Sequence, residues 1–249
     1  MADMTETTPP DGVIDSPDLA SLAGLLADAT RAAMCLALLD GRAWTATELA
    51  RHTGVAASTA TEHLHRLVAG GLLTEERRGR HRYVRLAGPD TAEMIESLAS
   101  HAPLRPARVR SLRDAHRRRA LAHARTCYDH LAGTVAVAIT DAMTERALLA
   151  WDYGPSLTAE GRRWLRGLGV GGPAGPVSYR AHVRTCLDWT ERREHLAGAV
   201  GAALFRHALD HGWVAARGTT RVVTVTDAGR DALRERLGLP ESVLLPPAG

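Results

Sequence analysis

The stretch TATELARHTGVAASTATEHLHRLVAGGLL, residues 45–73, decides the fold of the N-terminal part of the chain. Leu49 and Ala50 give a short helix one apolar face, and Gly54 permits the tight turn that ends this helix. A second helix is predicted over residues 57–69, because apolar residues recur there at helical spacing: Ala60, Leu64, Leu67 and Val68. The pattern is therefore helix, glycine turn, helix.

The flanking segments extend this pattern on both sides. Leucines at helical spacing from Leu19 onward predict a first helix, and a second one follows and ends at Gly41. After Gly70 and Gly71, the segment LLTEERRGRHRYVRL alternates in polarity and turns at Gly79, which predicts a hairpin over 72–77 and 82–86. A hairpin that directly follows two such helices is the arrangement of a winged helix-turn-helix.

Several short motifs in this region occur in a known order: Glu48-Leu49-Ala50, Ser58-Thr59, His63-Leu64, Gly70-Gly71-Leu72-Leu73, Arg78-Gly79-Arg80 and Tyr83. In this combination, residues 16–100 resemble the ArsR family of bacterial transcriptional repressors. The resemblance implies a homodimer that binds double-stranded DNA through a winged helix-turn-helix. ArsR relatives often sense metals at one of two sites, and the ligands of both are missing here. A site in the helix before the recognition helix would need a pair of cysteines, but TATELARH has none. A site in the dimerisation helix would need Asp-x-His, and although Asp90 and His101 are present, Ala92 takes the place of the first histidine.

The polar face of the second helix and the hairpin tip are the predicted DNA-binding surface. Short hydroxyls, a carboxylate and guanidinium groups on a recognition helix can contact phosphates and base edges in the major groove. Arginines at the tip of a wing can contact the backbone or the minor groove. The expected DNA-binding residues are Ser58, Thr59, Thr61, Glu62, His65, Arg66, Arg77, Arg78, Arg80, His81 and Arg82. His63 follows the inward side of the helix, so we expect a structural role for it.

The basic residues are all arginine, since the chain of 249 residues has no lysine, and the net charge is only +3. Two clusters stand out, one over residues 77–85 and one over residues 105–119. Local arginine clusters suit phosphate binding, although runs of arginine also occur as solvated helix faces. The second cluster predicts a connecting helix that either pairs with a partner subunit, follows DNA phosphates or lies in solvent.

The second half of the chain is an internal repeat. The segment RTCYDHLAG (residues 125–133) is similar to RTCLDWTERREHLAG (residues 184–198). Further along each copy, SLTAEGRRWLRGLGV (residues 156–170) is similar to TVTDAGRDALRERLGL (residues 224–239). Several matches in the same order establish a duplicated unit of about 50 residues. Each copy is interpreted as helix, short extended segment, helix, with Asp129 and either Asp188 or Thr190 as N-caps. The matched glycines and alanines near each helix start suggest that two helices cross closely there, and residues 213–225 predict a further hairpin around Gly218.

The repeat contains Cys127 with His130, and Cys186 with His195. If each cysteine lies in the segment that approaches its helix, the pseudo-twofold could bring all four together as a tetrahedral set of two sulfurs and two nitrogens. We expect the commoner outcome, in which these residues are core packing or line an organic-ligand pocket. A metal site and a thiol redox switch are the alternatives.

These observations define the expected organisation, which is mainly α with small β-hairpins. A leader (1–15) precedes the winged helix-turn-helix domain (16–102), an arginine-rich linker helix (103–124), a pseudo-symmetric, winged-helix-like domain (125–240, repeats 125–170 and 184–239) and a tail (241–249). Without a signal peptide or an apolar run long enough to span a bilayer, we expect a cytoplasmic protein. We expect a transcriptional repressor that responds to a small molecule or another signal, with no cofactor and no catalytic residue. The alternatives are a metal- or redox-responsive repressor, an enzyme with Cys127 or Cys186 as nucleophile, and a constitutive architectural DNA-binding protein.

Overall fold

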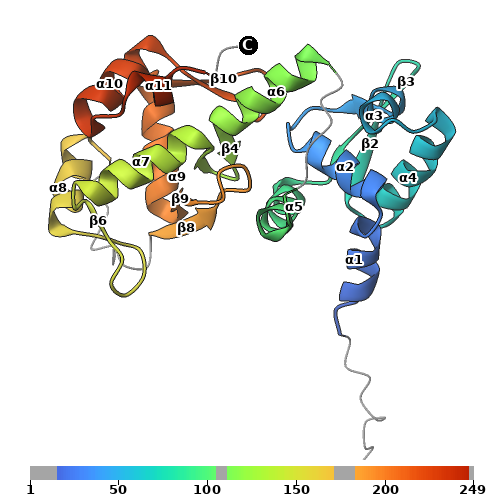
Figure 1. The fold of residues 1–249 in the computed structure, drawn as a ribbon, viewed down its shortest axis with the longest axis horizontal. Coiled ribbons are helices and arrows are strands. Elements are labelled where there is room, and N and C mark those ends of the chain that lie inside the picture. Colours follow the sequence, from blue (N-terminus) through green and yellow to red (C-terminus); the bar gives the residue numbers. More distant parts are fainter. Residues whose placement is uncertain (1–15, 105–110, 171–182, 247–249) are drawn as a thin grey trace, which may run out of the picture.

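The computed structural model describes residues 16–104, 111–170 and 183–246, so the leader predicted for residues 1–15 lies outside it (Figure 1). The described residues bury two hydrophobic cores, one in the winged helix and one in residues 124–244, which we call the C-terminal domain. In Figure 1 these two parts lie side by side, with α5 between them and α6 above.

The first part has the predicted helix-turn-helix and wing. Its elements are α1 (Leu19–Leu26), α2 (Ala29–Leu38), β1 (Trp44–Thr45), α3 (Ala46–Thr53), α4 (Ala57–Ala69), β2 (Leu73–Arg78), β3 (His81–Leu86) and α5 (Pro89–His101). A capping box of Thr45 and Glu48 begins α3, and Gly54 ends it in the left-handed conformation, with φ of 75°. The left-handed region is cheap for glycine, so the turn between α3 and α4 is determined by this residue.

The wing contains one strand that the sequence did not predict. β1 pairs with β3, so the sheet has the order β1-β3-β2, with Trp44 opposite Val84. This strand is only two residues long, too short for a periodicity to be visible. The helices and the sheet enclose the first core, whose largest members are Met34, Leu38, Leu39, Trp44, Leu49, Leu64, Leu67 and Leu72.

The arginine-rich linker forms α6 (Leu112–His123), which contacts both parts of the protein. Arg117 lies over the ring of Trp44, with its guanidinium carbon 5.0 Å from the ring centroid. At the other end of α6, Leu121 and His123 are buried, and His123 Nε2 lies 2.9 Å from the carbonyl oxygen of Val243. The helix is therefore partly an intramolecular bridge, which was not among the three predicted placements.

The two copies of the repeated sequence contain the same order of elements, but the local structure predicted for them was wrong. Each copy has the order hairpin, helix, hairpin, helix. The first hairpin, in the segment before the first helix, was not predicted. The first copy contains β4 (Arg125–Cys127), β5 (His130–Ala132), α7 (Thr134–Glu145), β6 (Leu149–Ala150), β7 (Ser156–Leu157) and α8 (Ala159–Gly167). The second contains β8 (Arg184–Leu187), β9 (Glu194–Ala197), α9 (Gly198–Asp210), β10 (Val214–Ala216), β11 (Val223–Val225) and α10 (Asp227–Leu237).

The predicted N-caps of the first helices were also wrong. Gly133 and Ala197 hold the N-cap positions of α7 and α9, because the strands β5 and β9 continue up to the helices. Asp188 nevertheless serves the first copy: the N–H of Gly133 donates to Asp188 Oδ2 over 2.7 Å. A carboxylate from one repeat thus accepts a hydrogen bond from the start of the other repeat's helix, where the helix dipole favours a negative charge.

The first helix of each repeat packs against a strand of the other repeat. α9 packs on β5 and α7 packs on β9, so each first helix covers the hairpin of the other copy. Small residues lie where each helix packs on a hairpin, whereas the sequence suggested a crossing of two helices at these positions. A Cβ added at Gly201 would lie 2.6 Å from the carbonyl oxygen of Leu196 and 3.4 Å from the Cβ of His130.

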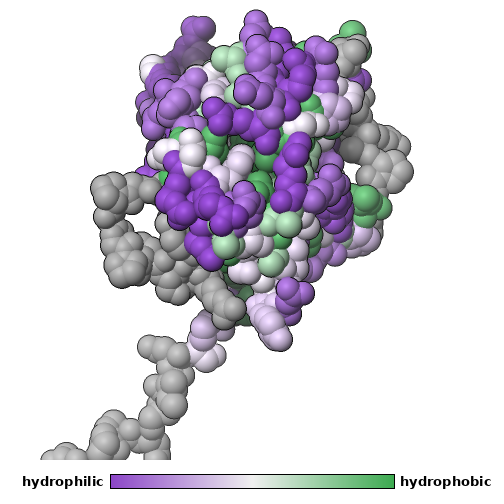
Figure 2. All heavy atoms as spheres, turned by 90° about the vertical axis from the view of Figure 1, so that its left-hand side faces the viewer, coloured by the Kyte–Doolittle hydropathy of each residue, from purple (hydrophilic) through white to green (hydrophobic). Residues whose placement is uncertain are grey.

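Residues 241–244, which the sequence assigned to a tail, form the short helix α11 (Glu241–Leu244), and Leu244 is fully buried in the second core. Figure 2 shows the outer face of the C-terminal domain, where apolar residues are visible between hydrophilic ones. Within the described ranges, no single helix is long and apolar enough to cross a membrane, and the sharply bent pair α1 and α2 meets those criteria only when taken together.

Two glycines of α8 provide a test of the repeat architecture. A Cβ added at Gly161 would collide with the backbone carbonyl of Leu148, so Gly161→Ala should lower the free energy of unfolding by about 1–3 kcal/mol. Gly167, in the same helix, has no neighbour within 4 Å of an added Cβ, so Gly167→Ala should leave stability unchanged or slightly raised. Urea unfolding of both variants measures the difference, and equal stabilities would contradict the packing of α8 on its hairpin.

Candidate DNA-binding surface and buried Cys-His cluster

The predicted DNA-binding residues lie on the outer face of α4 and on the wing formed by β2 and β3 (Figure 1). All of them are exposed except Thr61, which is half-buried and whose hydroxyl donates to the carbonyl oxygen of Ala57. The apolar side of α4 faces the core through Ala60, Leu64 and Leu67. The helix is thus oriented with its polar face available to a ligand.

Several of these charged side chains pair with each other at the surface. Arg66 donates to Glu62 over 2.6 Å along α4, and Arg82 pairs with Glu75 at 3.1 Å in the wing. Exposed ion pairs contribute about 0–1 kcal/mol, so these arginines can exchange their partners for phosphates at little cost. His63, predicted to be structural, leans toward α2, with its Nδ1 3.8 Å from Asp28 Oδ1.

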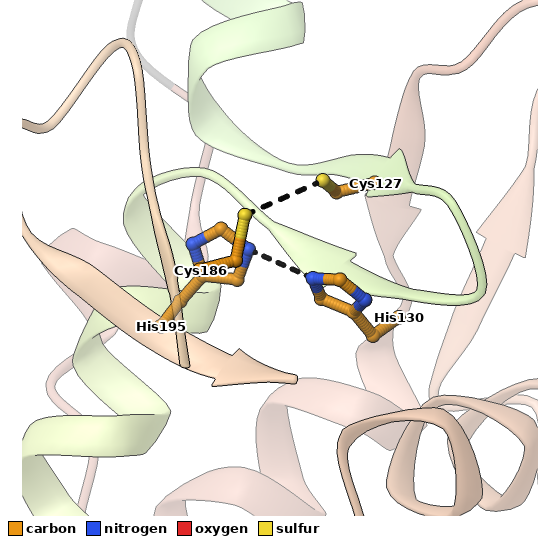
Figure 3. Close-up of side chains that lie close together, drawn as sticks. All are labelled: Cys127, His130, Cys186 and His195. Carbon is orange, nitrogen blue, oxygen red and sulfur yellow. Dashed lines mark hydrogen bonds between the residues drawn. The ribbon is translucent and has the colours of Figure 1, made fainter. Parts of the chain in front are cut away.

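The four residues Cys127, His130, Cys186 and His195 come together at the junction of the two repeats (Figure 3). Within each hairpin the cysteine and the histidine are direct cross-strand partners, Cys127 opposite His130 and Cys186 opposite His195. Directly opposed residues on antiparallel strands point to the same face. The two hairpins present these faces to each other, so all four candidate ligand atoms lie within 4.8 Å of one another.

The cluster is arranged as a sulfur pair and a nitrogen pair. The two Sγ atoms are 3.9 Å apart, and the Nε2 atoms of His130 and His195 are 3.1 Å apart. Cys127, His130 and His195 are buried, whereas Cys186 is half-buried and provides the most accessible sulfur. The sequence named these four residues, but only the hairpins explain how a spacing of nine residues brings Cys186 and His195 together.

The cluster shifts the pKa values of its members. Contact with the Cys186 sulfur, together with burial, raises the pKa of Cys127 to about 12, and the same contact lowers the pKa of Cys186. Burial alone would lower the pKa of His130, but contacts with Cys127 and Asp129 raise it overall. The two cysteines of the repeat therefore differ chemically, since the contact between them makes the Cys127 thiol harder to ionise and the Cys186 thiol easier to ionise.

A buried network of ionic groups adjoins the cluster. Arg125 is 1% exposed and lies between two carboxylates: its Nε donates to Glu96 Oε1 over 3.2 Å, and its Nη2 lies 3.1 Å from Asp188 Oδ2. Arg221 donates to Glu96 Oε2 over 2.9 Å. Burial would raise the pKa values of both carboxyls, but the arginines keep them low, and the pKa of Asp188 falls to about 2.

Glu96 belongs to α5 of the winged helix, so the network joins the two parts of the protein. Besides the two arginines, the Sγ of Cys127 donates to Glu96 Oε2 over 3.4 Å. The indole N–H of Trp189 donates to Glu96 Oε1 over 2.8 Å, and Trp189 packs against the first core. Arg192 donates to the carbonyl oxygens of Ser100 and Ala102 at the end of α5. The hairpin that carries Cys186 and His195 therefore holds α5 through its turn.

Sequence reasoning did not identify Glu96, Arg125, Asp188 and Arg221 as a connected set. The sequence held part of the information, since Arg125 and Asp188 belong to the motif that occurs in both copies. Their counterparts in the other copy, Arg184 and Asp129, are exposed in the structure. The repeat therefore showed which residues recur, but the contact with α5 determines which copy is buried.

The described residues contain two notable cavities. One, of about 60 Å³, is apolar and lies between the two repeats, lined by residues such as Leu131, Trp164, Phe205 and Trp213. This volume is far below the roughly 300–1,000 Å³ of typical ligand pockets. The other, of about 430 Å³, is a cleft between α5, the wing and β4, with a mixed lining that includes apolar groups and the polar side chains of Arg85, Glu93, Thr126 and Arg221.

The fold and the exposed arginine-bearing face define a DNA-binding protein of the winged helix-turn-helix class. A family model described as a helix-turn-helix domain matches residues 26–76. The chain is 38% identical over 225 residues to an uncharacterized HTH-type transcriptional regulator, YdfF, of Bacillus subtilis, an alignment that covers 90% of this chain and 99% of the relative. The chain therefore belongs to the family of HTH-type transcriptional regulators, the class of protein that the sequence predicted.

Solved structures of transcriptional regulators are similar to about a third of this chain. A homodimeric winged helix-turn-helix domain from Mycobacterium bovis, described as a possible ArsR-family transcriptional regulator, is 28% identical and has a TM-score of 0.29, with 33% of this chain and 82% of that chain covered. The cadmium sensor CMTR from Mycobacterium tuberculosis is 31% identical, with a TM-score of 0.30, 37% of this chain and 100% of that chain covered.

Removal of Arg125 tests the buried network. Arg125→Met leaves Asp188 fully buried without its cation and removes one of the two arginines on Glu96. We expect the free energy of unfolding to fall by about 3–5 kcal/mol, as for other buried pairs that lose one partner. The control is Arg163→Met, because Arg163 is 62% exposed in its pair with Glu160 and should contribute less than about 1 kcal/mol. Guanidinium unfolding that finds the two variants equal would contradict a role for the network in stability.

Proposed function

We propose that this regulator is a homodimeric repressor that binds operator DNA through α4 and the wing and is released by a signal sensed in the C-terminal domain. The observation that carries the proposal is the exposed polar face of α4 beside a wing with arginines at its tip. In this division of labour, residues 16–102 bind DNA, and residues 125–240 receive the signal. The protein would act in the cytoplasm, where repressor and operator can meet.

The chemistry of the surface supports separate roles for helix and wing. α4 is 13 residues long with short or polar side chains on its outer face, which is suitable for insertion into the major groove. Ser58, Thr59, Thr61, Glu62, His65 and Arg66 would contact bases and phosphates from this helix. Arg77, Arg78, Arg80, His81 and Arg82 would contact the backbone from the wing, where they supply salt-dependent affinity.

The exposed helix α1 supports a dimer. It has the apolar sequence LASLAGLL, yet it buries no residue fully, and Leu19 is 71% exposed. An apolar helix that projects from a small domain is typical of a protein interface. A second copy of this chain is the occupant we propose, because two recognition helices in one dimer would fit successive major grooves.

Release from DNA would follow from a shift between two dimer geometries. A signal that binds one geometry better than the other changes its population in proportion to the difference in affinity. The cleft of about 430 Å³ beside α5 is large enough for a small molecule, and the Cys-His cluster is a second place in the described residues where a signal could bind. Both adjoin α5, the helix that connects the two parts.

The enzyme alternative has less support. Cys127 is only 2% exposed and its thiol has a raised pKa, so a substrate would have to open the domain to reach a nucleophile that keeps its proton. Cys186 is more accessible, but its sulfur faces the other members of the cluster, so it does not face an open substrate pocket. A purely architectural DNA-binding role would leave the large C-terminal repeat without a purpose.

Wing and recognition helix should respond differently to substitution. Arg80→Ala should weaken binding to all DNA sequences and reduce the salt dependence by about one phosphate contact. Glu62→Ala should instead change the relative affinities for operator variants, since one good base contact is worth about 1–3 kcal/mol of discrimination. Gel shift and fluorescence anisotropy on the protein's own upstream DNA, at several salt concentrations, measure both effects.

Arg163→Ala, on the remote helix α8, is the control for loss of positive charge and should bind as the wild type does. Wild-type affinity in both Arg80→Ala and Glu62→Ala would show that α4 and the wing are not the DNA-binding surface. An absence of sequence-selective binding by the wild type would reject the repressor.

The dimer interface has a separate test. Leu19→Glu places a charge on the exposed apolar face of α1 and should raise the dimer dissociation constant about tenfold or more, the equivalent of losing one buried leucine. Leu112→Glu is the control, since Leu112 is 90% exposed on a different helix, α6. Sedimentation equilibrium would contradict the interface if Leu19→Glu dimerised as the wild type does.

A further inference from the structure

The Cys-His cluster is the one group of potential ligands that the winged-helix fold and the DNA-binding surface leave unexplained. It lies where the two repeats meet, with one thiol and one imidazole from each (Figure 3). We propose that Cys127, His130, Cys186 and His195 bind one zinc ion as a tetrahedral site. The same site would be the sensor that the proposed function requires, and this second part rests on that function.

The sulfur–sulfur and nitrogen–nitrogen distances match those of a tetrahedral zinc site. With Zn–S of about 2.3 Å and Zn–N of about 2.0–2.1 Å, ideal tetrahedral angles place two sulfurs about 3.8 Å apart and two nitrogens about 3.3–3.4 Å apart. The observed separations are 3.9 Å between the Sγ atoms and 3.1 Å between the Nε2 atoms. Neither pair needs to move by more than a few tenths of an ångström.

The orientation of the imidazoles also suits a metal. Both histidines direct Nε2 into the cluster, while Nδ1 faces a carboxylate: Asp129 Oδ1 at 3.3 Å for His130, and Asp188 Oδ2 at 3.5 Å for His195. A carboxylate behind the non-ligating nitrogen is the usual arrangement at zinc sites, where it fixes the tautomer. The Nδ1 of His195 is buried and makes no hydrogen bond to the described residues.

Core packing explains these contacts less well. Two imidazole nitrogens at 3.1 Å can share only one proton. The two thiols beside them lie in a largely buried site next to an apolar cavity, where polar groups need partners. A disulfide would require the sulfurs to approach to about 2.05 Å and would leave the imidazole pair unused. A single cation with four ligands uses both pairs at once, and half-buried Cys186 provides the entry.

Zinc binding would alter the contact of the cluster with the winged helix. Each cysteine binds as a thiolate, so two thiol protons leave to solvent, and the divalent ion is balanced by two thiolates. One of these protons is the one that Cys127 donates to Glu96 Oε2 of α5. The loaded site therefore cannot make this hydrogen bond, and a thiolate sulfur faces the Glu96 carboxylate instead.

The second hairpin gives the site another connection to α5. Its turn, between the strands of Cys186 and His195, carries Trp189, which donates to Glu96, and Arg192, which donates to the end of α5. A metal that fixes the two hairpins relative to each other thus acts on α5 at two places, at Glu96 in its middle and at its C-terminal end. We expect the zinc-loaded protein to bind its operator about tenfold or more weakly than the metal-free protein, a typical size for allosteric coupling.

Cobalt(II) is the probe for the site. Metal-free, reduced full-length protein is titrated with Co²⁺ and followed by absorption. We expect one equivalent to bind with intense d–d bands of tetrahedral cobalt and a thiolate-to-cobalt charge-transfer band, and one equivalent of Zn²⁺ to remove both. An absence of these bands, or octahedral cobalt alone, would overturn the site. Formation of a Cys127–Cys186 disulfide without any metal binding would overturn it in favour of a redox pair.

Variants assign the ligands. Cys127→Ser and Cys186→Ser should each lose at least half of the charge-transfer intensity per chain, and His195→Ala should lower metal affinity by about 10-fold or more. The matched control is Cys35→Ala, since Cys35 is buried in the first core, away from the cluster, and should leave the spectrum unchanged. Circular dichroism confirms that each variant is folded. Wild-type spectra in the folded Cys127→Ser or Cys186→Ser variant would reject the ligand set.

The regulatory part is measured on the same proteins by DNA-binding titrations with and without Zn²⁺. Zinc should weaken operator binding by the wild type and the Cys35→Ala variant, and should have no effect on Cys127→Ser. Zinc binding with unchanged DNA affinity would overturn the sensor and keep the site. If the wild type bound zinc but no DNA, the proposed function would fail, and the metal site would stand.

Discussion

Arg125 is the residue on which the arrangement of the two parts depends. Its guanidinium is 1% exposed and is held between Glu96 of the winged helix and Asp188 of the second repeat. A buried charge is tolerated only where partners replace its lost hydration, so these three groups must be assembled together. Arg221 and Trp189 complete the set around Glu96, and α5 is thereby fixed to the C-terminal domain.

The duplicated unit is symmetric in its hairpins and asymmetric in its contacts. Cross-strand pairing places one cysteine and one histidine at equivalent positions in each copy, and the two copies bring them together. The first copy also supplies Arg125, and the second copy supplies Asp188 and a longer turn that holds α5. One pair of hairpins can therefore form a shared site on one side and attach to the winged helix on the other.

This arrangement links chemistry in the C-terminal domain to the position of a helix in the winged-helix domain. α5 follows the wing directly in the chain, and its buried face contacts groups from both repeats. A change at the junction of the repeats would reach the DNA-binding surface through rigid elements. Networks of contiguous hydrogen bonds are one way in which coupling is carried between distant sites.

The sequence by itself determined the winged helix-turn-helix, because helical periodicity, the turn at Gly54 and the alternating wing are local signals, and α4 was predicted with its observed bounds. It also determined that residues 125–239 are a repeat and that Cys127, His130, Cys186 and His195 recur in it. It did not reveal the hairpins before α7 and α9, since strands of three or four residues are too short to show a period. Only the tertiary structure decided that the four side chains converge and that Arg125, not its counterpart Arg184, is buried, because both facts depend on contacts between segments distant in sequence.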